Sequence, residues 1–101
     1  MIEVTNDMEK IVGTDKSIVA FTADWCNPCK QMKPHFARIG VTDANSNYFV
    51  VDVDKISNDY LSKYGIQSVP QILVLNKGEL VQKVNGRTFD TISNELGLSV
   101  E

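Results

Sequence analysis

The strongest constraint on the fold is a pair of short, nearly continuous apolar runs separated by a helical pattern. The first run lies within residues 17–23 and the second within 47–54. Such runs, without polar alternation, are typical of strands that are covered on both faces of a sheet. Between the runs, apolar residues recur at helical spacing: Met32, Phe36 and Ile39. We therefore expect a strand, a helix that ends at Gly40, and a second strand parallel to the first.

The segments next to these strands predict two further short helices. Before the first strand, Asn6 and Glu9 have the spacing of a capping box and predict a helix over 6–13. After the second strand, Ser57 is placed to cap another helix, which should end before Gly65.

The last third of the chain predicts a hairpin and a final helix. Two apolar runs, 72–75 and 80–84, are separated by a short loop that contains Gly78, which is typical of paired antiparallel strands. Thr88 then precedes a helical face formed by Phe89, Ile92 and Leu96. The expected fold class is α/β, with a central mixed β-sheet flanked by helices, parallel at its start and antiparallel at its end.

Length and composition indicate one domain over residues 1–101. Of the 101 residues, 43% are hydrophobic and 23% are charged, which suits a globular domain with one core. The longest apolar runs have four residues, so we expect no membrane span and no secretory signal. The net charge of -3 disfavours nucleic acid and anionic membranes as partners.

The chain has two cysteines, Cys26 and Cys29, at the start of the helix after the first strand. Residues three apart on a helix are surface neighbours, so the two sulfur atoms can come within bonding distance. We expect the pKa of the Cys26 thiol to be lowered, because free N–H groups and the helix dipole at this end favour a negative charge. Cys29 lies one turn deeper. This asymmetry predicts Cys26 as the nucleophile in thiol–disulfide exchange and Cys29 as the resolving thiol.

The spacing of the cysteines also argues against other roles. A disulfide between them closes almost no loop, so stability is not its purpose, and without a secretory signal we expect a reducing cytoplasm. Zinc needs four ligands, and the one histidine, His35, lies on the opposite side of the helix from Cys26, where we expect it to be partly exposed. Asp52 and Asp54 are interpreted as solvated carboxylates at a strand end.

Two longer motifs resemble the thioredoxin family. Residues 23–30 read Ala-Asp-Trp-Cys-Asn-Pro-Cys-Lys, with Pro34 five positions after the second cysteine, and residues 63–70 read Lys-Tyr-Gly-Ile-Gln-Ser-Val-Pro. The similarity continues through the hairpin to Gly86 and covers nearly the whole chain. It implies a thioredoxin fold and a cis peptide bond between Val69 and Pro70 that faces the cysteines.

The resemblance also implies an activity and a set of site residues. The activity is that of a thiol–disulfide oxidoreductase, which reduces protein disulfides through a mixed disulfide and is recharged by a thioredoxin reductase. The electrons are held in the dithiol, so we expect no bound cofactor and no metal, and we expect a monomer. For Trp25, packing at the core edge is an equal alternative to substrate contact. The residues expected to contact substrate are Trp25, Asn27, Pro28, Val69, Pro70 and Gly86.

Four positions depart from the usual thioredoxin pattern. Asn27 stands where the family usually has Gly, and Gln71 where Thr is common. Ala20 stands where the family usually has a buried Asp, and Val50 where a Lys commonly partners that Asp. Asn27 therefore bears on the reduction potential, and the absent charged pair bears on the proton route to Cys29. We expect Ala20 to be buried beside Val50.

Two alternative functions are compatible with the same motifs. A glutaredoxin-like protein would use glutathione, although glutaredoxins usually place Pro directly after the first cysteine, and the sequence has no obvious cationic glutathione site. A docking subunit would use the same fold as a binding surface without redox turnover.

Overall fold

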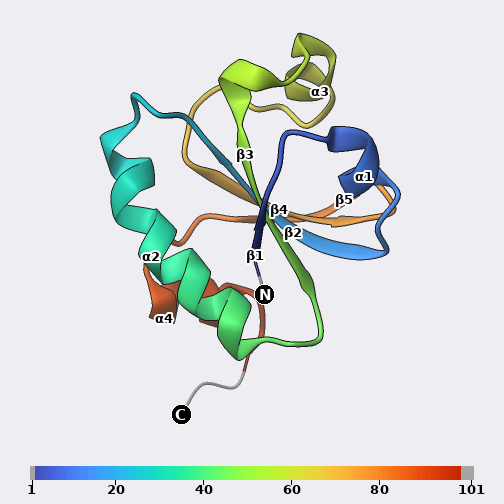
Figure 1. Cartoon of the computed structure of the whole chain (residues 1–101). Coiled ribbons are helices and arrows are strands. Elements are labelled where there is room, and N and C mark those ends of the chain that lie inside the picture. Colours follow the sequence, from blue (N-terminus) through green and yellow to red (C-terminus); the bar gives the residue numbers. More distant parts are fainter. Residues whose placement is uncertain (1, 99–101) are drawn as a thin grey trace.

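The computed structural model describes residues 2–98, which form a five-stranded sheet with helices on both faces (Figure 1). The sheet has the order β1-β3-β2-β4-β5. β3 runs parallel to both β1 and β2, whereas β4 is antiparallel to β2 and to β5. The predicted mixed sheet is therefore confirmed.

In chain order the elements are β1 (Ile2–Val4), α1 (Met8–Val12), β2 (Lys16–Thr22), α2 (Asn27–Thr42), β3 (Asn47–Asp52), the 3-10 turn η1 (Val53–Lys55), α3 (Asn58–Lys63), β4 (Gln71–Asn76), β5 (Glu79–Val84) and α4 (Phe89–Glu95).

Within each apolar run, successive side chains point to opposite faces of the sheet and so enter two different core clusters. On the face covered by α2 and α4, the first core cluster is formed by Ile18, Ala20, Met32, Phe36, Ile39, Tyr48, Val50, Ile72, Val74, Val84, Phe89 and Ile92. On the face covered by α1 and α3, the second core cluster is formed by Met8, Ile11, Val19, Phe21, Phe49, Val51, Tyr64, Leu73 and Leu75. Burial on both faces explains why these strands lack polar alternation.

The N-terminal segment differs from its prediction. The N-cap of α1 is Asp7, whose carboxylate accepts from the Lys10 N–H, so the prediction that Asn6 caps this helix was wrong. The side chain of Asn6 instead accepts from the backbone N–H of Asp52, at 3.0 Å. β1 was not predicted at all. It has three residues, and it is held in place by pairing with β3, which lies more than forty residues away in the sequence.

Two other boundaries were misplaced by two residues. α2 continues past Gly40 to Thr42, because Gly40 is needed for a close approach to β1 rather than for a helix end: a Cβ there would collide with the side chain of Ile2. β3 ends at Asp52 rather than at residue 54, because the Asp52 carboxylate accepts from the Asp54 N–H and starts η1.

The predicted hairpin is confirmed, with Lys77 and Gly78 as its two turn residues. Both have positive φ, 49° and 83°, as a tight turn between twisted strands requires. The Tyr64 hydroxyl donates to the Gly78 carbonyl at 2.7 Å and ties the turn to the end of α3. Within residues 2–98, no helix is both long enough and apolar enough to cross a membrane.

Candidate active site

Cys26 and Cys29 lie where β2 delivers the chain to the N-terminus of α2. Cys26 is the N-cap residue, with extended backbone (φ -91°, ψ 105°), and Pro28 lies in the first turn, where its missing N–H is not needed. The backbone N–H of Cys29 donates to the Cys26 sulfur at 3.2 Å. The two residues form a disulfide, with their Cα atoms 5.3 Å apart. A sulfur at this position meets a free N–H and the positive end of the helix dipole, and both favour a negative charge.

The disulfide is enclosed by apolar side chains. Cys29 is fully buried and Cys26 is 4% exposed, and together with Ala23 they form a small third core cluster, against which Val53 and Val69 pack. Asn27 and Pro28, the two residues between the cysteines, are exposed. The surface next to Cys26 is therefore formed by these two residues and by the loop opposite.

That opposite loop carries Val69 and Pro70. The peptide bond between them is cis, as the resemblance implied. The Val69 carbonyl oxygen lies 3.6 Å from the Cys26 sulfur, and Pro70 is buried. Two segments more than forty residues apart in sequence are thus in contact at the Cys26 sulfur.

Trp25 lies beside the dithiol as a surface residue, with 67% of its area exposed, and is not part of the core. Its indole N–H donates to the Asp54 carboxylate at 2.8 Å. Sequence reasoning missed this role of Asp54, although a signal existed: β2 and β3 are parallel neighbours, so the residues after both strands meet at one edge of the sheet. Asp54 therefore orients a side chain of the site rather than being only a solvated carboxylate.

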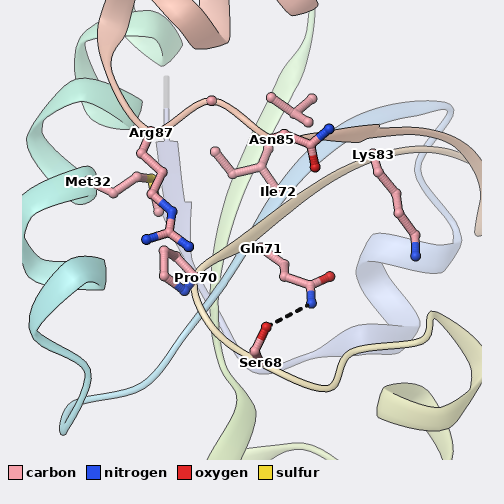
Figure 2. A pocket seen from close by; sticks show the side chains of 10 residues that line it. Met32, Ser68, Pro70, Gln71, Ile72, Lys83, Asn85 and Arg87 are labelled. Atoms are coloured by element: carbon pink, nitrogen blue, oxygen red, sulfur yellow. Dashed lines mark hydrogen bonds between the residues drawn. The ribbon is translucent and has the colours of Figure 1, made fainter.

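Two hollows flank the Val69–Pro70 segment. The apolar groove, of about 170 Å³, is lined by Trp25, Val53, Leu61, Ile66, Gln67, Ser68 and Val69. The polar pocket, of about 280 Å³, lies on the other side, toward β5 and the start of α4 (Figure 2). It is lined by Met32, Ser68, Pro70, Gln71, Ile72, Lys83, Val84, Asn85, Gly86 and Arg87. The site thus has two sides of different chemistry.

Gly86 lines the polar pocket through its backbone, and the structure gives a separate reason for glycine at this position. A Cβ on Gly86 would lie 2.6 Å from the Thr91 hydroxyl and 2.7 Å from the Glu95 carboxylate, so the space beside its Cα is occupied by α4. The Glu95 carboxylate accepts from the N–H groups of Asn85 and Gly86. These contacts fix the loop between β5 and α4 against the helix.

Ala20 and Val50, two of the departures from the family pattern, are buried side by side as expected. Ala20 is fully buried on β2, and Val50 is its register partner on β3 with 8% exposure, which confirms the predicted apolar pair. Both belong to the first core cluster, together with Met32, three residues after Cys29 on α2. His35 is half-buried as expected, and its Nδ1 accepts from the Phe89 N–H at 3.0 Å, so it holds the start of α4.

Comparisons with known proteins agree with this geometry. The family model described as Thioredoxin matches residues 2–97. The mitochondrial Thioredoxin-2 of Schizosaccharomyces pombe is 30% identical over 96 residues, covering 94% of this chain and 71% of that protein. Thioredoxin H5 of Arabidopsis thaliana is 28% identical, covering 94% and 81%. The crystal structure of Schistosoma mansoni thioredoxin superposes with a TM-score of 0.77 at 26% identity, covering 92% of this chain and 90% of that one. With a dithiol at the N-terminus of α2, the fold that surrounds it and a family match over nearly its whole length, this chain belongs to the thioredoxin family.

Proposed function

We propose that this thioredoxin-family thiol–disulfide oxidoreductase reduces disulfides in proteins, with Cys26 as the nucleophile and Cys29 as the resolving cysteine. The observation that carries the proposal is the position of the Cys26 sulfur at the N-cap of α2, where it accepts the Cys29 N–H. After reduction, that N–H and the helix dipole stabilise a thiolate on Cys26. Cys29, fully buried among apolar side chains, has no comparable support for a charge.

The proposed reaction has two exchange steps. The Cys26 thiolate attacks one sulfur of the substrate disulfide, forming a mixed disulfide and releasing the other substrate sulfur as a thiolate, which takes up a proton. Cys29 then loses its proton and attacks the Cys26 sulfur. This closes the Cys26–Cys29 disulfide and releases the second substrate sulfur. Two electrons pass from the cysteine pair to the substrate, whose two sulfurs take up one proton from Cys29 and one from solvent.

The surface around the dithiol supports a role in substrate binding for six residues. The backbone of Val69 beside Pro70 is placed to pair with an extended substrate segment, because the Val69 carbonyl lies 3.6 Å from the Cys26 sulfur. The other proposed contacts come from Trp25, Asn27 and Pro28 next to the cysteines, and from the backbone of Gly86 in the polar pocket.

We further propose that the chain acts in the cytoplasm as a monomeric, single-domain reductant, recharged by a thioredoxin reductase. Thioredoxins act on protein disulfides and are recharged in this way, and the Cys26–Cys29 disulfide at the N-terminus of α2 supports the same cycle here. The named relatives include a mitochondrial protein, so the compartment is the part of this proposal that fractionation should test first.

Reduction of insulin disulfides by the pre-reduced protein tests the chemistry. Wild type should reduce insulin, Cys26→Ser should not, and Cys29→Ser should stop at a stable mixed disulfide that is visible by mass spectrometry. Turnover by Cys26→Ser would contradict the assignment. Failure of wild type to reduce insulin, with its fold intact, would favour the docking subunit.

Alkylation tests the asymmetry of the two thiols independently. Limiting iodoacetamide near neutral pH should modify Cys26 well before Cys29 in the reduced protein. Equal labelling would refute the nucleophile assignment.

The electron donor separates the thioredoxin cycle from the glutaredoxin-like alternative. Turnover with NADPH and a thioredoxin reductase should exceed turnover with glutathione and glutathione reductase. The reverse order would favour the alternative.

A further inference from the structure

The polar pocket beside Pro70 is distinguished by its charge. Two of its lining residues are cationic, Lys83 and Arg87, and none of the residues that line it is acidic. The chain as a whole has a net charge of -3, so this positively charged pocket is opposite in sign to the protein's overall charge.

Within the part of the chain that the structure describes, neither cation forms an ion pair. The ion pairs formed within residues 2–98 are Lys10 with Glu3 and Lys77 with Asp15, and neither includes Lys83 or Arg87. The Glu95 carboxylate, at the end of α4, accepts from two backbone N–H groups, those of Asn85 and Gly86, and forms no ion pair with either cation. Both cations are on exposed residues.

The two cations reach the pocket from different elements. Arg87 lies in the loop before α4, and Figure 2 shows its guanidinium group between Met32 and Pro70. Lys83 is on β5 opposite Leu73, and its ammonium lies 3.7 Å from the position that a Cβ added to Gly65 would occupy. Figure 2 shows the Gln71 side chain between the two cations, with its amide donating to the Ser68 hydroxyl at 3.5 Å.

The pocket is also within reach of the reaction. Val69, which precedes Pro70, places its carbonyl oxygen 3.6 Å from the Cys26 sulfur, and Pro70 itself lines the pocket. An extended chain advances about 3.3 Å per residue. A substrate segment that is bonded to Cys26 and runs past Val69 therefore brings a side chain one or two residues from its cysteine to the mouth of the pocket.

We propose that Arg87 and Lys83 select disulfide substrates that carry an aspartate or glutamate one or two residues from the reactive cysteine. The inference rests on the proposed function, since it assigns a substrate preference to the same dithiol. A planar guanidinium group binds a carboxylate through two parallel hydrogen bonds, so Arg87 is the direct partner in this proposal. The Lys83 ammonium, on the other side of Gln71, adds attraction at longer range. Gln71, where the family commonly has Thr, adds an amide to the same pocket. The apolar groove on the other side of Val69 offers no such charge.

The test compares three disulfide-linked peptides that differ only at the positions flanking the cysteine: glutamate, glutamine or lysine. The second-order rate constant for reduction by the pre-reduced protein is measured at low and at high salt, without any reductase. Wild type should reduce the glutamate peptide about threefold to fivefold faster than the glutamine peptide at low salt, as partly exposed ion pairs allow. The preference should shrink at high salt, and the lysine peptide should be the slowest.

The variants are Arg87→Gln, Lys83→Gln and the double variant, with Arg87→Lys as the conservative change. The ratio of glutamate to glutamine rates should fall to near one in the double variant, and Arg87→Lys should retain part of it. Lys77→Gln removes the same charge at the opposite end of β4, and it should leave the ratio unchanged.

Equal wild-type rates on the glutamate and glutamine peptides would overturn the inference. An undiminished preference in the double variant would overturn it as well. Failure of the wild type to reduce any of the peptides would overturn the proposed function itself, and this inference with it.

Discussion

The two ends of the first core cluster differ in charge: one end is entirely apolar, and the other contacts a buried carboxylate. Near the dithiol, the register partners Ala20 and Val50 are both apolar. Two residues earlier on β3, the Tyr48 hydroxyl donates to the Asp43 carboxylate at 2.8 Å, where α2 ends. Burial raises the pKa of Asp43, but hydrogen bonds from Tyr48, Asn45 and Ser46 outweigh burial and hold that pKa below its usual value. Burial and the bond to Asp43 raise the pKa of Tyr48.

The difference shows what a buried carboxylate needs. Asp43 remains charged because three groups donate to it, whereas the buried neighbours of Ala20 are aliphatic and aromatic side chains of the first core cluster. A charge placed at position 20 would therefore lose its hydration without gaining hydrogen bonds. In the proposed reaction, the proton of Cys29 would therefore pass to water or to the departing thiolate.

The largest expected effect comes from placing a carboxylate at the apolar end with Ala20→Asp. Desolvation should raise its pKa well above 3.9 in the folded state. Below the unfolded pKa both states are protonated, and only the smaller cost of burying a neutral polar group remains. Above it the unfolded chain ionises first, so folding loses stability until the pH exceeds the folded pKa. A shift of two to three units costs about 3–4 kcal/mol at high pH. Urea melts at pH 4 and pH 8 measure it.

The matched control for this change is Ala20→Asn, which is similar in size but cannot ionise. Its loss of stability should be the same at pH 4 and pH 8. Equal losses for Ala20→Asp at the two pH values would show that position 20 is not a desolvated site. Stopped-flow reduction of a model disulfide adds a second readout, since Ala20→Asp should resolve mixed disulfides faster near neutral pH if its carboxylate can relay the Cys29 proton.

At the other end of the cluster, the stability that Asp43 contributes should increase as the pH rises. Because the folded-state pKa of Asp43 is lowered, its charged form stabilises the fold above the unfolded pKa, and this stability is lost as the pH falls through the folded pKa. Asp43→Asn should cost about 2 kcal/mol at pH 7, as expected for hydrogen bonds to a charged group, and less in acid. Urea melts of this variant and of the exposed control Asp24→Asn at pH 7 and pH 2.5 measure it. A cost independent of pH would contradict the role of the charge.

We expect the apolar pair Ala20 and Val50 to leave the reduction potential of the Cys26–Cys29 pair near the value typical of thioredoxins. We expect the potential within about 40 mV of the roughly -270 mV typical of thioredoxin, since 30 mV already corresponds to about 1.4 kcal/mol. The Cys26 sulfur keeps its N-cap position, and the Asn27 amide should at most stabilise the thiolate slightly and raise the potential. Equilibration of wild type and Asn27→Gly in glutathione buffers measures this. A value near -120 mV, that of a strong oxidase, would reverse the assigned direction of electron flow.

The smallest effect concerns a hydrogen bond to an aspartate that is exposed rather than buried. Asp54→Ala removes the acceptor of the Trp25 indole N–H, and stability should fall by less than about 1 kcal/mol because water replaces the carboxylate. The indole should gain motion, visible as a lower fluorescence anisotropy of this single tryptophan. Asp59→Ala, an exposed acid on α3, serves as the control. Unchanged anisotropy in Asp54→Ala would show that the bond does not orient Trp25.

Much of the fold could be predicted because its signals are local. The runs around Ile18 and Phe49 alternate with helical patterns, and this order alone requires parallel strands joined by a helix. Cys26 and Cys29 are three residues apart after a strand, so a helix start brings their sulfurs together. Periodicity and short spacing act within one element, so they can be recognised from the sequence alone.

Only the tertiary structure decided which distant segments meet. β1 is too short to predict and gains its order from pairing with β3. Asp54 contacts Trp25 just after β2 and β3 end, and Glu95, at the end of α4, accepts from the N–H of Gly86. Lys83 and Arg87 line one pocket beside Pro70. The sequence determined the helices α1 to α4, the four longer strands and the place of the two cysteines, since those depend on neighbours along the chain. The surroundings of the thiols depend on how the sheet packs against its helices, and no local pattern encodes that packing.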